Sequence, residues 1–182
     1  MTKQYSEKFK NAFELHKNNK LDEAEILYNE ILQAEPENAE VWNLLGMINL
    51  QKFKLGKAEE YIQKAISITA EPYFYENLAK VYLEKEDTQR AITLYKELLN
   101  YMPENFNFTF NLASAYKLSG DIDNAIKTYK KAIEIIPTNP DTYYNLGLIY
   151  TDMGKPQEAI KYYKEAIKYN PNDMDTKYFT AL

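Results

Sequence analysis

The sequence predicts an all-α protein built as a linear array of stacked helix pairs. Eight positions recur at intervals of 34 residues, with small residues replaced by small and aromatic residues by aromatic. Glycine and proline follow the same period as the apolar residues. A period of this length on a helical pattern is typical of a solenoid, in which each unit packs only against its neighbours. The last full copy of the pattern is Asn145, Leu146, Gly147, Tyr150, Ala159, Tyr163, Ala166 and Pro171, and the two preceding copies lie within residues 111–137 and 77–103.

Aligning the copies predicts one elongated domain over residues 1–182, with five repeats and a short C-terminal helix. The second repeat is one residue short, and Phe53–Gly56 at its turn make it the least regular. Single helices of this size are marginal in water, so we expect stacking between repeats to supply most of the stability. The repeats span residues 5–38, 39–71, 72–105, 106–139 and 140–173, and residues 174–182 begin a sixth unit.

Within each repeat, two small residues predict where the paired helices touch. The first helix carries glycine or alanine at position eight, and the second carries alanine at position 20, so that the two backbones can approach closely. Leucine at position seven and tyrosines at positions 11 and 24 are expected to pack around this contact. The small residues are Ala12, Gly46, Ala79, Ala113 and Gly147 at position eight, and Ala24, Ala58, Ala91, Ala125 and Ala159 at position 20. The packing residues are Leu45, Leu78, Leu112, Leu146, Tyr82, Tyr116, Tyr150, Tyr28, Tyr95, Tyr129 and Tyr163.

Turn residues predict the ends of these helices. Asn19, Gly120 and Gly154 fall between the two helices of their repeats, where a left-handed residue ends a helix at low steric cost. Pro156 suits the first turn of a second helix, because its missing N–H would have no helical partner there. Four further prolines are expected to stop second helices near position 32: Pro36, Pro103, Pro137 and Pro171.

Composition favours a cytoplasmic protein without a cofactor. The chain has 182 residues, a net charge of -5 and no cysteine, which argues against nucleic acid as a partner and against thiolate metal sites. It contains no apolar stretch long enough to insert in a membrane and no apolar signal-peptide core. The single histidine, His16, has no second ligand at metal-binding spacing, so a solvated or groove-lining imidazole is expected. We find no catalytic motif, and predict that the protein is not an enzyme.

The recurring small and aromatic residues, with Trp42–Gly46 in repeat two and Tyr-x-x-Ala before proline, resemble the tetratricopeptide repeat (TPR). The resemblance covers nearly the whole chain. It implies a right-handed superhelix of antiparallel helix pairs, in which the first helices line a concave groove that binds peptides or partner proteins. The family does not by itself name the partner.

The resemblance also places candidate groove residues at positions 2, 5, 6, 9 and 12 of the first helices. Asparagine recurs at position six, and this resembles the asparagine ladder of O-GlcNAc transferase TPR arms. Such amides can grip the N–H and C=O groups of an extended peptide; alternatively, they hold local hydrogen bonds. The candidates are Phe9, Phe13, Asn43, Met47, Asn77, Lys80, Phe110, Asn111, Tyr144, Asn145 and Leu148.

Three functions follow from these observations. The leading hypothesis is a noncatalytic scaffold that binds a peptide or protein segment in its groove. The alternative is the N-terminal, substrate-recruiting TPR arm of a larger enzyme such as a glycosyltransferase. A third is self-association, as a homodimer formed through the C-terminal helix at residues 174–182. The lysine and asparagine set by which some TPR proteins clamp a terminal carboxylate is not present at the corresponding positions.

Overall fold

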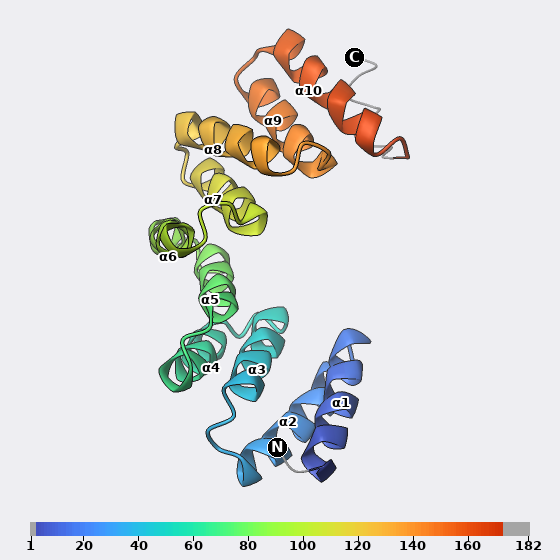
Figure 1. The fold of residues 1–182 in the computed structure, drawn as a ribbon, viewed down its shortest axis with the longest axis vertical. Helices are drawn as coiled ribbons and strands as arrows, with labels where there is room; N and C mark the ends of the chain where they lie inside the picture. Colours follow the sequence, from blue (N-terminus) through green and yellow to red (C-terminus); the bar gives the residue numbers. More distant parts are fainter. Residues whose placement is uncertain (1–2, 173–182) are drawn as a thin grey trace. The chain divides into compact units, whose positions relative to one another are not determined.

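The computed structural model describes residues 3–172, and over that range the secondary structure is entirely helical. Figure 1 shows the helices following one another as antiparallel pairs, so the predicted all-α class and the paired arrangement are confirmed. The expected helix at 174–182 lies outside the described residues. The helices are α1 (Lys3–Lys17), α2 (Leu21–Ala34), α3 (Ala39–Gln51), α4 (Leu55–Ile68), α5 (Pro72–Glu84), α6 (Thr88–Tyr101), α7 (Phe106–Leu118), α8 (Ile122–Ile135), α9 (Pro140–Asp152) and α10 (Pro156–Tyr169).

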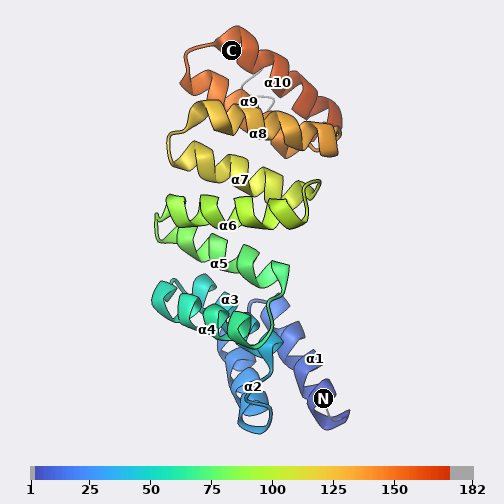
Figure 2. The ribbon, with the colours of Figure 1, turned by 60° about the vertical axis from the view of Figure 1, so that its left-hand side comes forward.

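The chain divides into two compact units at residue 87. The N-terminal unit, residues 1–87, contains α1–α5, and the C-terminal unit, residues 88–182, contains α6–α10. In the N-terminal unit, α1 packs on α2 and α3 on α4; in the C-terminal unit, α7 packs on α8 and α9 on α10. Figure 2 shows these pairs within each unit.

The small residues at position eight bring paired helices into direct backbone contact. A Cβ atom added to Gly46 in α3 would lie 2.4 Å from the Cγ1 of Ile62 and 3.2 Å from the carbonyl oxygen of Ala58, both in α4. At Gly147 in α9, an added Cβ would lie 2.4 Å from the ring of Tyr163 in α10. The predicted close approach is therefore confirmed, and in these two pairs it leaves no room for even a methyl group.

The predicted packing residues form the core around this contact. The tyrosines at position 24 are almost completely buried, as are the leucines at position seven. Two of these tyrosines also satisfy their hydroxyl groups across the helix pair: the Tyr129 and Ser114 hydroxyl oxygens lie 2.8 Å apart, and the Tyr163 hydroxyl lies 3.1 Å from Thr151 Oγ1. Burial raises the pKa of Tyr129 to about 12, so the phenol stays protonated and can donate.

All five turns between the first and second helices share one backbone motif. The second residue after the helix has positive φ, as predicted for Asn19, Gly120 and Gly154 (φ 58°, 80° and 67°). The next N–H then bonds to a carbonyl five residues back, for example Lys20 N to Leu15 O at 2.9 Å, which is the Schellman arrangement. Phe53 and Glu86 also occupy this position (φ 55° and 60°). The sequence did not predict them, because neither residue type favours left-handed backbone.

Proline and asparagine define the other helix ends. Pro156 begins α10, as predicted, and Pro36, Pro103 and Pro137 each follow a second helix by two residues. Two residues after each of these last three prolines comes an asparagine that caps the next first helix. The side chains of Asn38, Asn105 and Asn139 accept hydrogen bonds from the backbone N–H groups of Val41, Phe108 and Thr142, at 3.1, 3.0 and 2.9 Å. The Pro-x-Asn spacing is visible in the sequence and could have predicted these caps.

Phe53→Gly is expected to raise the free energy of unfolding by about 1 kcal/mol, since glycine adopts the left-handed conformation without the roughly 1–2 kcal/mol penalty of other residues. The phenylalanine side chain is 78% exposed, so its removal loses little packing. Gly154→Ala is the matched control, at the same turn position in repeat five, and should lower the stability. Urea unfolding followed by circular dichroism measures both; a loss of stability in Phe53→Gly would contradict the argument.

Gly46→Ala is expected to lower the free energy of unfolding by about 1–2 kcal/mol. Overpacking against Ile62 and the Ala58 carbonyl outweighs the roughly 1 kcal/mol gained in helix propensity. Gly56→Ala in the adjacent α4 is the control, because an added Cβ there meets nothing within 4 Å, and it should be neutral or mildly stabilising. The urea midpoint should therefore fall for Gly46→Ala and stay unchanged or rise for Gly56→Ala. Equal falls in both variants would contradict the close-contact interpretation.

Candidate functional site

A hollow in the N-terminal unit lies on the first helices of its repeats. It has a volume of about 460 Å³. Every residue that lines it belongs to α1, α3, α5 or the turn after α1, and none belongs to α2 or α4. We call it the N-terminal hollow. Its lining comprises Phe13, His16 and Lys17 on α1, Asn19 in the turn, Glu40, Asn43, Leu44, Met47 and Gln51 on α3, and Tyr73 and Asn77 on α5.

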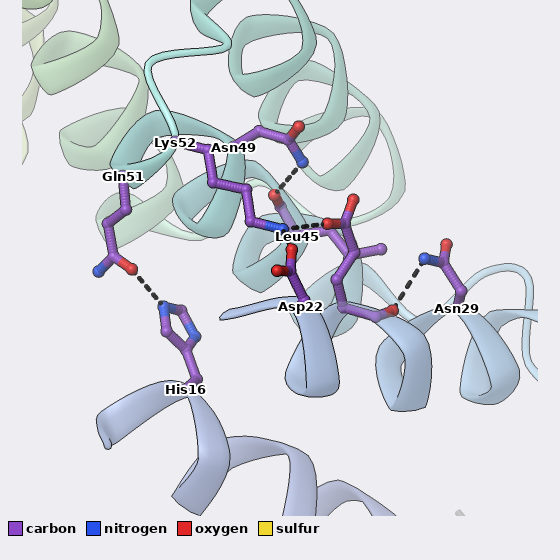
Figure 3. Close-up of polar contacts among 8 residues, drawn as sticks. His16, Asp22, Asn29, Leu45, Asn49, Gln51 and Lys52 are labelled. Atoms are coloured by element: carbon purple, nitrogen blue, oxygen red, sulfur yellow. Dashed lines mark hydrogen bonds and ion pairs between the residues drawn. The ribbon is translucent and has the colours of Figure 1, made fainter. Parts of the chain in front are cut away.

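A contact between side chains joins α1 to α3 at one edge of the hollow. His16 Nε2 and Gln51 Oε1 lie 3.2 Å apart, and Figure 3 shows the imidazole of α1 directed toward the amide of α3. Burial lowers the pKa of His16, and the hydrogen bond to Gln51 opposes this only in part. The imidazole is therefore neutral at pH 7, and contributes a hydrogen-bonding group to the hollow without a charge.

A lysine at the end of α3 fixes that helix against α2. The Lys52 ammonium lies 2.6 Å from Asp22 Oδ1 and 2.5 Å from Glu25 Oε2, and Figure 3 shows the Lys52 side chain extending toward Asp22. The lysine side chain is only 15% exposed, and the two carboxylates hold its pKa above the usual value although burial opposes them. The cation also suits the C-terminal end of α3, and Asp22 the first turn of α2. Since α2 packs on α1, this ion pair helps to position α3 relative to α1.

Two further side-chain contacts join α3 to α5. Asn77 Nδ2 donates to Asn43 Oδ1 at 3.0 Å, and the Tyr73 hydroxyl donates to the Glu40 carboxylate. Burial, together with the hydrogen bond and negative charge of Glu40, raises the pKa of Tyr73 above its normal range. The phenol therefore stays a donor at all ordinary pH values. Asn77 Oδ1 and Asn43 Nδ2 are the other two polar atoms of these amides, and they form no side-chain hydrogen bond among the described residues.

The remaining lining gives the hollow an apolar wall and little net charge. Phe13 is 40% exposed, Met47 is half-buried, and Leu44 forms part of the core beneath them. Lys17 and Glu40 carry opposite charges. A surface of amides, an imidazole and apolar side chains suits an uncharged polar ligand with an apolar group, and the backbone of a peptide is such a ligand.

The structure brings four predicted groove residues together in this hollow: Phe13, Asn43, Met47 and Asn77. Two other predicted residues of the N-terminal unit lie elsewhere. Phe9 stacks on Phe13 but packs into the core against Tyr28, and Lys80 forms an ion pair with Glu76 at 2.9 Å.

In the C-terminal unit, the predicted groove residues mostly serve local contacts. Phe110 packs edge-on against Tyr129, and Tyr144 lies against Tyr163. Asn145 donates to the backbone carbonyl of Asp141 at 2.9 Å and accepts from Lys117 at 3.2 Å, so both ends of its amide are engaged. Asn111 and Leu148 are half-buried on α7 and α9. The predicted row of Asn77, Asn111 and Asn145 runs through both units and stays a prediction.

Seven residues that line the hollow were absent from the predicted groove set. Tyr73 and Glu40 occupy position two, and His16 occupies position 12, which are positions that the TPR resemblance had indicated. The groove positions of the family could therefore have identified these three residues. Gln51, Lys17 and Asn19 lie at or just beyond helix ends, where the repeat pattern does not predict the direction of a side chain. The seven are His16, Lys17, Asn19, Glu40, Leu44, Gln51 and Tyr73.

Neither a metal centre nor a membrane span is found within residues 3–172. No group of three or more histidine, aspartate or glutamate side chains there is arranged to hold a metal ion. None of the helices in this part of the chain has the length and apolar character needed to cross a bilayer.

Models of the tetratricopeptide repeat match the chain over residues 14–72, 75–106 and 140–173, and a TPR repeat model matches residues 113–154. Together with the helix pairs and the first-helix hollow, these matches decide the family. The protein belongs to the tetratricopeptide repeat family. The predicted membership is thus confirmed, whereas the likeness of its position-six asparagines to O-GlcNAc transferase arms remains a prediction.

Solved TPR structures share the fold of this protein over nearly its whole length. YrrB, described as a TPR protein with an unusual peptide-binding site, is 20% identical and has a TM-score of 0.73, over 96% of this chain and 91% of that one. TTC0263 from Thermus thermophilus is 20% identical, with a TM-score of 0.77 and 97% of each chain covered. A structure of MamA is 25% identical, with a TM-score of 0.75, over 90% of this chain and 96% of that one.

Among curated proteins, the chain resembles part of the BBSome complex member BBS4. The cattle protein (Bos taurus) is 28% identical over 79 residues, and the mouse protein (Mus musculus) is 27% identical over the same length. The match covers 43% of this chain but only 15% of each relative. This similarity therefore concerns a few repeats and not the whole relative.

Proposed function

We propose that the protein is a noncatalytic scaffold that binds an extended segment of a partner protein in the N-terminal hollow. The proposal rests on which elements supply the lining residues. All of them come from the first helices of three repeats and the turn after α1. TPR proteins typically mediate contacts between proteins, and the similar protein YrrB is described as having a peptide-binding site. The N-terminal hollow is the surface of the N-terminal unit that offers such a ligand both polar and apolar contacts.

The amide pair of Asn43 and Asn77 supplies the polar part of the binding. One amide hydrogen bond joins the two side chains. Asn43 is only 2% exposed and orients the half-buried Asn77 amide, which leaves Asn77 Oδ1 to accept from a peptide N–H. Contacts of this kind recognise the backbone and not a particular side chain. Their mutual hydrogen bond holds the two amides in a fixed orientation before the ligand arrives, which lowers the entropic cost of binding.

The apolar wall supplies the anchor. Phe13 of α1 and Met47 of α3 both line the hollow, and Phe13 is exposed although it is a large aromatic residue. Covering such a side chain with an apolar group of the ligand removes both from water, at roughly 25 cal/mol per Å². We therefore expect the ligand to be an extended segment with one apolar side chain and little net charge at this point.

Asn77→Ala is expected to weaken binding of such a peptide about tenfold, because loss of a paired hydrogen-bonding group costs about 1.4 kcal/mol. The peptide is first selected from a displayed random library on the wild-type protein, and its Kd is then measured by titration calorimetry. Asn11→Ala is the matched control: it is an exposed asparagine on α1 outside the hollow, and should change Kd less than twofold.

Equal Kd values for wild type and Asn77→Ala would reject the amide grip, and selection of peptides that bind Asn77→Ala and Asn11→Ala alike would place the binding surface elsewhere. Asn145→Ala tests the longer row of asparagines separately. A loss similar to that of Asn77→Ala would mean that the peptide runs along both units, whereas an unchanged Kd would restrict the grip to the N-terminal unit.

A further inference from the structure

A second hollow, in the C-terminal unit, has a different chemistry. It has a volume of about 370 Å³ and is lined by residues of α6, α7 and α8. Figure 2 shows α7 between α6 and α8, and α7 packs against both. Most of its rim comes from the second helices α6 and α8, so this hollow does not belong to the first-helix surface described above. We call it the lysine pocket.

Three lysines converge on the lysine pocket. Lys96 stands on α6, and Lys127 and Lys131 stand one turn apart on α8. No aspartate or glutamate lines the pocket. Within residues 3–172, none of the three lysines has an ion pair, although several other lysines of the same range do. Like charges four residues apart on a helix repel each other, so this arrangement carries a small cost that a bound anion would remove.

The floor of the lysine pocket is apolar. Leu99 of α6 and Leu112 and Tyr116 of α7 line it, and Leu112 belongs to the core. Two asparagines and a threonine complete the lining. A ligand that fits both parts needs negative charge at its edges and an apolar group between them.

The geometry points to a short acidic peptide segment as the ligand of the lysine pocket, with two or more carboxylates around one aliphatic or aromatic side chain. Charge complementarity carries this assignment, because the chain as a whole has a net charge of -5 and yet presents three uncompensated cations here. Several carboxylates along a peptide match lysines that are spread over two helices. No arginine lines this pocket, so it lacks the guanidinium that binds a phosphate through two parallel hydrogen bonds.

This inference is independent of the proposed function, since the lysine pocket and the N-terminal hollow lie in different units. It adds a second binding surface, selective for charge, to a first that grips the peptide backbone. An acidic motif of the partner, or of a second partner, would occupy it.

The test uses the full chain and a fluorescein-labelled peptide of sequence Glu-Asp-Glu-Leu-Asp-Glu, with binding followed by fluorescence anisotropy. The triple variant Lys96→Gln, Lys127→Gln and Lys131→Gln is expected to bind the peptide at least tenfold more weakly. Each of the three screened charge pairs contributes a few-fold to the affinity. The matched control changes three exposed lysines outside the pocket, Lys130→Gln, Lys161→Gln and Lys164→Gln, and should change Kd less than twofold although it removes the same charge.

Further measurements distinguish binding in the lysine pocket from general electrostatic attraction and from unfolding of the variant. The three lysines changed together to arginine keep the charge and should retain binding, whereas a peptide with Gln and Asn in place of Glu and Asp should bind at least tenfold more weakly. Raising the salt concentration from about 50 to about 300 mM should weaken binding of the acidic peptide. Asn77→Ala should leave this Kd unchanged, so failure of one proposal does not affect the other.

Three results would overturn the inference. Equal losses in the pocket triple and the control triple would show that only net charge matters. Tighter binding of a singly phosphorylated peptide or of a single-stranded RNA of the same length would assign the lysines to another class of ligand. No detectable binding of the acidic peptide to the wild-type chain at millimolar concentration would show that the pocket does not bind such a segment.

Discussion

The close approach of paired helices at position eight is the contact on which the rest of the structure depends. Where Gly46 faces Ile62 and the Ala58 carbonyl, the first helix has no side chain of its own and packs directly on the second. This contact sets the distance between first and second helices, and the buried tyrosines and leucines can fill the remaining space only at that distance. Because protein interiors are packed at crystal-like density, the spacing of one pair is passed on to the next helix along the array.

The turns contribute a second constraint that is independent of residue type. In all five of them, one residue adopts positive φ and the following N–H bonds to a carbonyl five residues back. Two of these residues are glycine, one is asparagine, and the others are Phe53 and Glu86, for which the conformation is unfavourable. The packing of each helix pair imposes the turn, and the residue at that position adapts to it. Tertiary contacts therefore outweigh local preference at these positions.

With both constraints satisfied, the two kinds of helix are free to carry different chemistry on their exposed faces. The first helices of the N-terminal unit present amides, an imidazole and exposed apolar groups, and their contacts, from His16 to Gln51 and from Asn77 to Asn43, hold these side chains in place. The second helices of the C-terminal unit present lysines over an apolar floor. A repeat protein can in this way keep one core and bind chemically distinct ligands, because each surface is built from residues that the core does not use.

The sequence by itself determined the class of the protein, the helix pairs and most of the buried residues. Spacing in the chain is sufficient for these, since a small residue at position eight and a tyrosine at position 24 have the same neighbours in every repeat. It also indicated the first-helix positions at which Phe13, Asn43, Met47 and Asn77 line a common hollow. Only the tertiary structure decided which contacts the other candidates make: Phe9 and Phe110, both half-buried, pack against the core, while Asn145 is engaged in local hydrogen bonds. It alone brought Lys96 together with Lys127 and Lys131, because residues about 30 positions apart become neighbours only through the packing of α6, α7 and α8.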